Sequence, residues 1–133
     1  MLRAALVFAA GMALATSAAW AFDSGNCLNT IAINQTASTE LYVPVNKMHI
    51  CGLALVNATA QNLSLVEGTG TVCGTGTKGL IGGSTASMAF ANNGILTMAS
   101  SMPFLSTAVK ADHLCLLQSS TGNVSGTITF NDQ

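Results

Sequence analysis

Two His-x-Cys pairs are the residues of this sequence best suited to chemistry. They are His49 with Cys51 and His113 with Cys115, and both fall in stretches of strand-like composition. Residues two apart on a strand point to the same face, so two neighbouring strands would gather two imidazoles and two thiolates. Such a set suits zinc or copper. The alternative is that Cys51 and Cys115 are disulfide partners, with the histidines beside them for unrelated reasons.

The number of cysteines favours disulfides. Cys27, Cys51, Cys73 and Cys115 make an even count in a short chain, and small exported domains use such cysteines as disulfide bridges. Spacing alone does not select the connectivity. The matched His-x-Cys pairs make Cys51–Cys115 the preferred bridge, which leaves Cys27–Cys73 as the second. Buried free thiols are the other interpretation.

A glycine-rich segment, residues 68–79 (GTGTVCGTGTKG), invites comparison with a phosphate-binding loop. A phosphate loop needs Gly-Lys followed by Ser or Thr at the start of a helix. Here Lys78 is followed by Gly79, and no helical periodicity comes after it. We therefore interpret the segment as a tight, glycine-shaped loop pinned by Cys73.

Catalytic chemistry finds no support in the remaining residues. Asp112 and His113 are adjacent, so on a strand they face opposite ways and cannot make the Asp–His bond of a catalytic triad. The acidic residues are scattered rather than paired, which removes the signal expected of a glycosidase. The sequence predicts no catalytic residue, no cofactor and no enzymatic activity.

The elements that position these residues are short strands. Val124, Ile128 and Phe130 alternate with hydroxyl-bearing residues, a pattern typical of a half-buried strand. The stretches 48–56 and 114–117 are apolar on both faces, and the first of them is expected to be a central strand covered on both sides. Pro44 indicates a strand edge or a strand end. Strands are predicted around residues 31–33, 41–45, 48–56, 63–65, 78–81, 87–91, 94–98, 114–117 and 124–130. Their spacing predicts an all-β fold, a single antiparallel β-sandwich or jelly-roll-like domain over residues 22–133.

The first 21 residues have the layout of a secretory signal peptide. Arg3 supplies a basic start, an almost wholly apolar run follows, and Ala19-Trp20-Ala21 matches the small-x-small cleavage pattern. The apolar run is too short for a comfortable membrane span. We expect cleavage after Ala21, export to the periplasm, the cell surface or the medium, and no membrane span in the mature chain.

Charge is scarce throughout the predicted mature chain. Loss of Arg3 leaves three lysines against five acidic residues, a net charge of −2 with both histidines neutral. So few cations exclude nucleic-acid binding driven by phosphate neutralisation. A neutral surface rich in Ser, Thr, Asn and Gly gives little repulsion between copies. Such a surface favours self-association or packing into a larger assembly.

The order of motifs resembles a family of small β-sandwich proteins of tailed phages, prophages and bacterial genomes. The resemblance rests on Cys27, the Ile-Cys-Gly of residues 50–52, the Gly-Thr-rich segment 65–77, the Leu-Cys-Leu of residues 114–116 and the closing segment 125–130. It implies a virion surface component of the capsid-decoration, head-fibre or tail-associated type, with the virion as an alternative location. Two features depart from the family pattern: the signal peptide, and Leu80-Ile81-Gly82 where many relatives carry Leu-Thr-Gly.

Two functions follow as expectations. The first is a non-enzymatic structural or interaction module, a virion-like surface subunit or an exported relative of one. The second is an exported binder of a metal or a carbohydrate, with His49, Cys51, His113 and Cys115 as the metal ligands. The scarcity of aromatic residues argues against the carbohydrate version, because sugar sites use aromatic stacking platforms.

Overall fold

The structure, a computed structural model, describes residues 27–133, which form ten strands and one short 3-10 helix. The predicted signal peptide, residues 1–21, lies outside the described residues. The strands are β1 (Asn29–Gln35), β2 (Thr39–Tyr42), β3 (Met48–Asn57), β4 (Gln61–Thr69), β5 (Thr75–Ile81), β6 (Met88–Phe90), β7 (Gly94–Ala99), β8 (Leu105–Ser106), β9 (His113–Gln118) and β10 (Val124–Asp132), and the helix η1 spans Thr71–Cys73.

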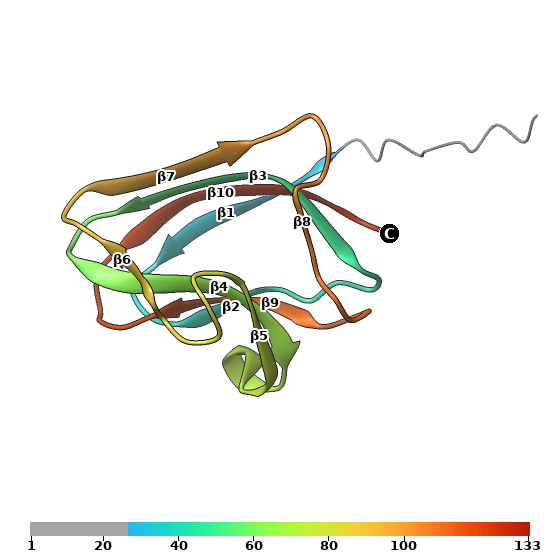
Figure 1. Cartoon of the computed structure of the whole chain (residues 1–133), viewed down its shortest axis with the longest axis horizontal. Helices are drawn as coiled ribbons and strands as arrows, with labels where there is room; N and C mark the ends of the chain where they lie inside the picture. Colours follow the sequence, from blue (N-terminus) through green and yellow to red (C-terminus); the bar gives the residue numbers. More distant parts are fainter. Residues whose placement is uncertain (1–26) are drawn as a thin grey trace, which may run out of the picture.

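The strands form two antiparallel sheets that lie one above the other (Figure 1). Sheet A has the order β1-β10-β3-β7, and β8 pairs with the start of β3 at His49 and Ile50. Sheet B has the order β2-β9-β4-β5, and β6 also pairs with β4. The first strand therefore lies beside the last, and the second beside the second-to-last. The prediction of an all-β antiparallel fold is confirmed.

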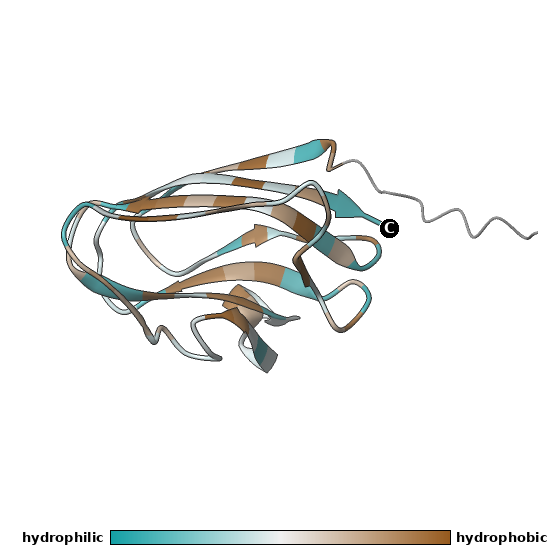
Figure 2. Cartoon of the chain, turned by 45° about the horizontal axis from the view of Figure 1, so that its top comes forward, coloured by the Kyte–Doolittle hydropathy of each residue, from teal (hydrophilic) through white to brown (hydrophobic). Residues whose placement is uncertain are grey.

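One hydrophobic core fills the space between the sheets. Sheet A contributes alternate residues such as Leu53, Leu55 and Ile128, and sheet B contributes others such as Leu65 and Leu116. The strand centres are largely hydrophobic, while hydrophilic residues gather in the turns and at the strand ends (Figure 2). The alternation predicted for the last strand is confirmed, since Val124, Ile128 and Phe130 are buried in this core.

A second, smaller cluster lies on the opposite face of sheet B. Val66 and Cys115 are buried there against Cys73, with Val72 and Leu117 packed around them. The η1 segment thus covers part of the outer face of sheet B. This cover explains why residues 114–117 are apolar on both faces. The loop predicted over residues 68–79 is confirmed only around η1, where Cys73 holds it, because residues 75–79 belong to β5.

Two strand predictions are wrong in detail. The segment 48–56 is central in its sheet but is covered on one face only, because the other face carries small residues such as Gly52 and Ala54, and Val56 is 39% exposed. The second strand ends at Tyr42, before Pro44, and leaves Val43 and Val45 exposed in the following loop. Proline lacks the N–H that would continue the ladder.

Within residues 27–133, no helix is long and apolar enough to cross a membrane.

Candidate interaction surface

The two His-x-Cys pairs lie in different sheets. His49 and Cys51 are on β3 of sheet A, and His113 and Cys115 are on β9 of sheet B. His49 Nδ1 pairs with Ser106 Oγ at 2.7 Å, and His113 Nδ1 pairs with Glu40 Oε2 at 2.5 Å. The structure therefore does not bring the four residues together. In the described part of the chain, no group of three or more His, Cys, Asp or Glu side chains is placed to hold a metal ion.

All four cysteines form disulfides, but the expected connectivity is wrong. Cys27 is bonded to Cys51, and Cys73 is bonded to Cys115. The reason is the direction of Cys115, which belongs to the small cluster on the outer face of sheet B and so points away from sheet A. Cys51 lies on β3, beside the bulge in the β10–β3 pairing, and faces the start of β1. Two disulfides are consistent with an oxidising, exported environment.

Asp132 ties the C-terminal strand to the loop after β2. Its Oδ2 accepts hydrogen bonds from the Tyr42 hydroxyl at 3.2 Å and from the Val45 N–H at 2.9 Å, and its Oδ1 accepts one from the Asn46 N–H at 2.8 Å. Desolvation by burial raises the pKa of Tyr42, and the neighbouring Asp132 carboxylate raises it further. The carboxylate therefore holds sheet A and sheet B together at this end.

The Asp132→Asn variant is expected to lower the pKa of Tyr42 toward its ordinary value without reaching it, because the burial remains. Tyr42 is the single tyrosine of the chain, so alkaline titration of tyrosinate absorbance reports on it directly. A pKa raised in the folded state stabilises the fold below the unfolded-state pKa of about 10, and that contribution is lost as the pH rises through the folded value. An unchanged titration in the variant would contradict the contact.

The edges of the two sheets differ in how they are protected. In sheet B, β5 carries Lys78 and has two register shifts against β4, β2 carries Glu40 and one shift against β9, and β6 has only three residues. Charges, bulges and short strands are the usual devices that prevent a free edge from pairing with another chain. In sheet A, the edge strands β1 and β7 carry no charge and no proline and their pairing is regular, and the two-residue strand β8 pairs only with the start of β3.

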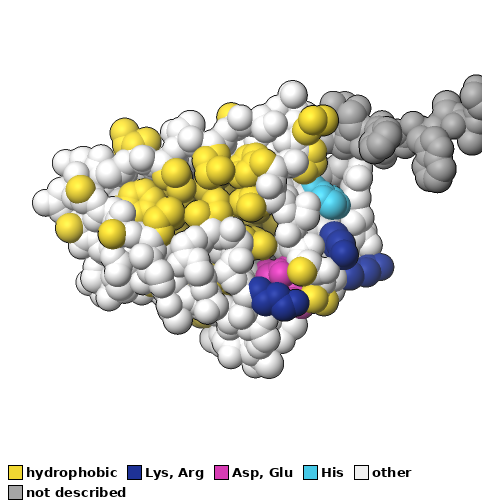
Figure 3. Space-filling model, viewed as in Figure 1, with side chains coloured by type: hydrophobic (Ala, Val, Ile, Leu, Met, Phe, Trp, Pro, Cys, Tyr) yellow, Lys and Arg dark blue, Asp and Glu magenta, His cyan; other side chains and the backbone are white. Residues whose placement is uncertain are grey.

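An apolar patch adjoins β7. We use this term for Phe90, Leu96, Met98 and Phe104, hydrophobic residues that are incompletely buried where β7 of sheet A faces β6 of sheet B. A Cβ built on Gly94 would lie 3.1 Å from the Phe90 ring, which shows how closely β6 approaches the start of β7. Figure 3 shows hydrophobic side chains gathered on this side of the molecule, with the visible charged side chains away from its centre, toward the β8 end.

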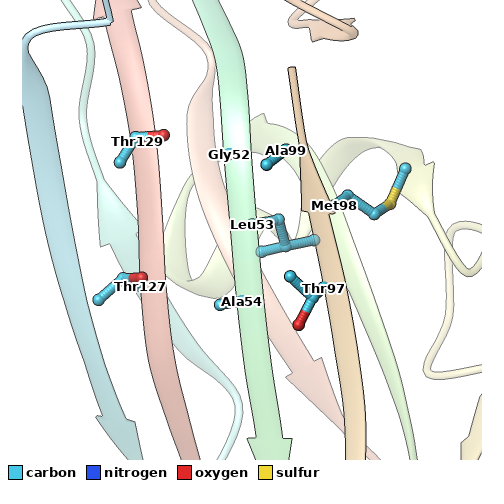
Figure 4. Close-up of a pocket in the computed structure, with 8 residues that line it drawn as sticks. All are labelled: Gly52, Leu53, Ala54, Thr97, Met98, Ala99, Thr127 and Thr129. Atoms are coloured by element: carbon cyan, nitrogen blue, oxygen red, sulfur yellow. The ribbon is translucent and has the colours of Figure 1, made fainter. Parts of the chain in front are cut away.

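A shallow depression lies on the outer face of sheet A. It has a volume of about 200 Å³ and lies over Gly52 and Ala54, with Thr97 on one side and Thr127 and Thr129 on the other (Figure 4). Pockets for small molecules usually measure about 300–1,000 Å³ and combine apolar walls with polar groups aimed at the ligand. This depression is smaller, and its lining carries no charge. It does not favour a ligand-binding function.

Within residues 27–133, the one stacked aromatic pair, Tyr42 and Phe130, does not form a sugar-binding platform. The rings of Tyr42 and Phe130 pack against each other with centroids 4.7 Å apart, and Phe130 is 2% exposed. The sequence analysis did not identify the residues of the β7 edge. The signal was present in the uncharged, proline-free run 94–99, but its position at a free edge depends on the strand order.

Comparisons of this chain with protein-family models, with curated proteins and with solved structures find no match.

Proposed function

We propose that this protein is a non-enzymatic, exported jelly-roll subunit that assembles with further copies of itself through the edge of sheet A. In this proposal it is a virion-type surface or decoration subunit, or an exported relative of one. The observation that carries the proposal is the contrast between the protected edges of sheet B and the unprotected β7 edge beside the apolar patch. An uncharged edge strand with regular geometry is a template for pairing with another chain.

The strand order supports the architectural part of the proposal. The orders β1-β10-β3-β7 and β2-β9-β4-β5 are nested pairs of strands of the kind found in two-sheet jelly rolls, an architecture used by capsid and lectin domains. The near absence of charge supports the assembly part. With so few like charges on its surface, electrostatic repulsion between copies is weak.

The test is the molar mass of the full chain in solution, produced through an oxidising secretory compartment so that both disulfides form. We expect light scattering after size-exclusion chromatography to give a mass above that of the monomer, rising with protein concentration. The association should persist at high salt, because exposed ion pairs are screened by salt and apolar contacts are not. A monomer at every concentration and salt level would overturn the proposal.

A further inference from the structure

We infer that two copies of the chain join through β7 in an antiparallel, two-fold symmetric pair centred on Thr97. This inference rests on the proposed self-association and specifies the partner strand, its direction and its register. An antiparallel pair of identical strands is self-complementary, so it closes as a dimer rather than growing into a filament. Among residues 27–133, the outer edge of β7 pairs with no strand, so it is open to this partner.

The hydrogen-bond pattern identifies the residues that face the partner. Ser100 donates its N–H to the Cys51 carbonyl at 2.9 Å, in register with the β3–β7 ladder. Bonded and non-bonded pairs alternate along an antiparallel ladder, so Met98 and Leu96 also bond to β3. The N–H and C=O groups of residues 95, 97 and 99 therefore point outward. Centring the pair on Thr97 sets 95 opposite 99 and forms about six backbone hydrogen bonds.

The same register closes the apolar patch. With Thr97 opposite its own copy, Leu96 of one chain lies opposite Met98 of the other, and the reverse. Leu96 and Met98 lie on the core side of sheet A, since they pair with Leu55 and Leu53 of β3. Met98 is 37% exposed in the single chain. The dimer would place each apolar patch against the other and remove both from water, which is the main driving force for association.

The other uncharged edge strand of sheet A, β1, is a poorer candidate for the dimer interface. Asn29, Thr30 and Asn34 of β1 are exposed polar residues, and its hydrophobic residues Ile31 and Ile33 already pack in the core. Pairing of β7 with β1 of a second copy would continue sheet A in the antiparallel sense. It would leave the apolar patch facing a polar edge, and it would produce open filaments rather than a closed dimer. The burial of apolar surface favours β7 against β7.

Single-cysteine variants test the register. In the proposed pair, the Cα atoms of residue 97 in the two copies are about 5.5 Å apart, within the range of a disulfide. Thr97→Cys is therefore expected to form a covalent dimer under mild oxidation, seen by non-reducing electrophoresis. Ile95→Cys and Ala99→Cys are each about 14 Å from their own copies and should remain uncrosslinked alone. A mixture of these two variants should crosslink, because 95 lies opposite 99.

A charge variant tests the edge independently. Thr97→Lys places two like charges opposite each other and is expected to weaken dimerisation at least about tenfold. Thr127→Lys is the matched control: Thr127 is exposed on the same outer face but lies on the central strand β10, so this variant should dimerise normally. Far-UV circular dichroism checks that both variants fold.

Two results separate the failure of this inference from the failure of the proposed function. If the wild-type chain associates but Thr97→Cys does not crosslink and Thr97→Lys associates normally, the β7 pairing is wrong while self-assembly stands. If the wild-type chain stays monomeric at every concentration, both fail. If Ile95→Cys crosslinks with Thr97→Cys and not with Ala99→Cys, the proposed register is wrong.

Discussion

Replacing Gly126 with alanine is expected to destabilise the fold by more than about 3 kcal/mol. Gly126 lies in β10 with φ +154°, and a Cβ at this position would come 1.8 Å from the Ala54 carbonyl oxygen of β3. Backbone atoms cannot move aside as a flexible side chain can. The substitution therefore has to separate β10 from β3, the two central strands of sheet A. Chemical denaturation followed by circular dichroism measures the loss.

The matched control for this prediction is Gly76→Ala. Gly76 also has a positive φ, +66°, but a Cβ there meets nothing within 4 Å. The loss of stability in Gly76→Ala should be limited to the cost of holding alanine in a left-handed backbone conformation, about 1 kcal/mol. Equal losses of stability in the two variants would show that strain in the backbone dihedral, and not the contact with Ala54, determines the result at Gly126.

Removal of the Cys73–Cys115 disulfide by a double alanine substitution is expected to cost about 4 kcal/mol from loop closure alone. The bridge spans 42 residues. Both cysteines are fully buried in the small cluster on sheet B, so the variant also loses packing against Val66. The η1 segment depends on this bridge, because Val72 and Cys73 both have positive φ. Thermal and chemical denaturation of the double variant measure the effect.

The second disulfide supplies the control. Cys27–Cys51 spans 24 residues, so loop closure predicts a loss only about half a kcal/mol smaller. Packing makes the larger difference between the two disulfides, because Cys27 is half-buried at the start of the described chain whereas Cys73 and Cys115 are fully buried. We expect its removal to cost less and its reduction by dithiothreitol to come first. A Cys27–Cys51 bridge that resists reduction longer than Cys73–Cys115 would contradict this order.

Local patterns in the sequence predicted most of the strands, because each strand has its own alternation and turn residues. The two-residue strand β8 was not predicted, since Leu105–Ser106 is too short to show a period. The boundary of β2 was missed because the apolar residues Val43 and Val45 continue the alternation beyond the point where Pro44 ends the pairing. Hydrophobic character alone does not show whether a residue is buried.

The His-x-Cys pattern did not predict the correct disulfide connectivity. The His-x-Cys pairs indicated correctly that Cys51 and Cys115 each share a strand with a histidine. They did not indicate the sheet to which each strand belongs, which follows from the pairing of β3 with β10 and of β9 with β4. The two-faced run 114–117 contained a usable signal. If Leu114 and Leu116 face the core, Cys115 faces away from it, toward the glycine-rich loop that contains Cys73.

The β7 edge could be recognised only from the assembled structure. The run 94–99 was predicted as a strand, and its lack of charge is visible in the sequence. What the sequence does not show is that β5 and β2 are the edges of one sheet while β1 and β7 are the edges of the other. The contrast between protected and unprotected edges depends on that assignment, because charge on a central strand and charge on an edge have different effects.

Each disulfide lies within one sheet, and neither joins the two. Cys27–Cys51 links the start of β1 to β3 in sheet A, and Cys73–Cys115 links the η1 segment to β9 in sheet B. Each sheet is therefore braced by its own disulfide, and the two sheets are joined by loops, by the hydrophobic core and by polar contacts such as the Tyr42–Asp132 hydrogen bond. Under mechanical load we expect the contact between the two sheets to fail first. Force applied to opposite sheets shears this contact, whereas force along one sheet is resisted by the disulfide of that sheet.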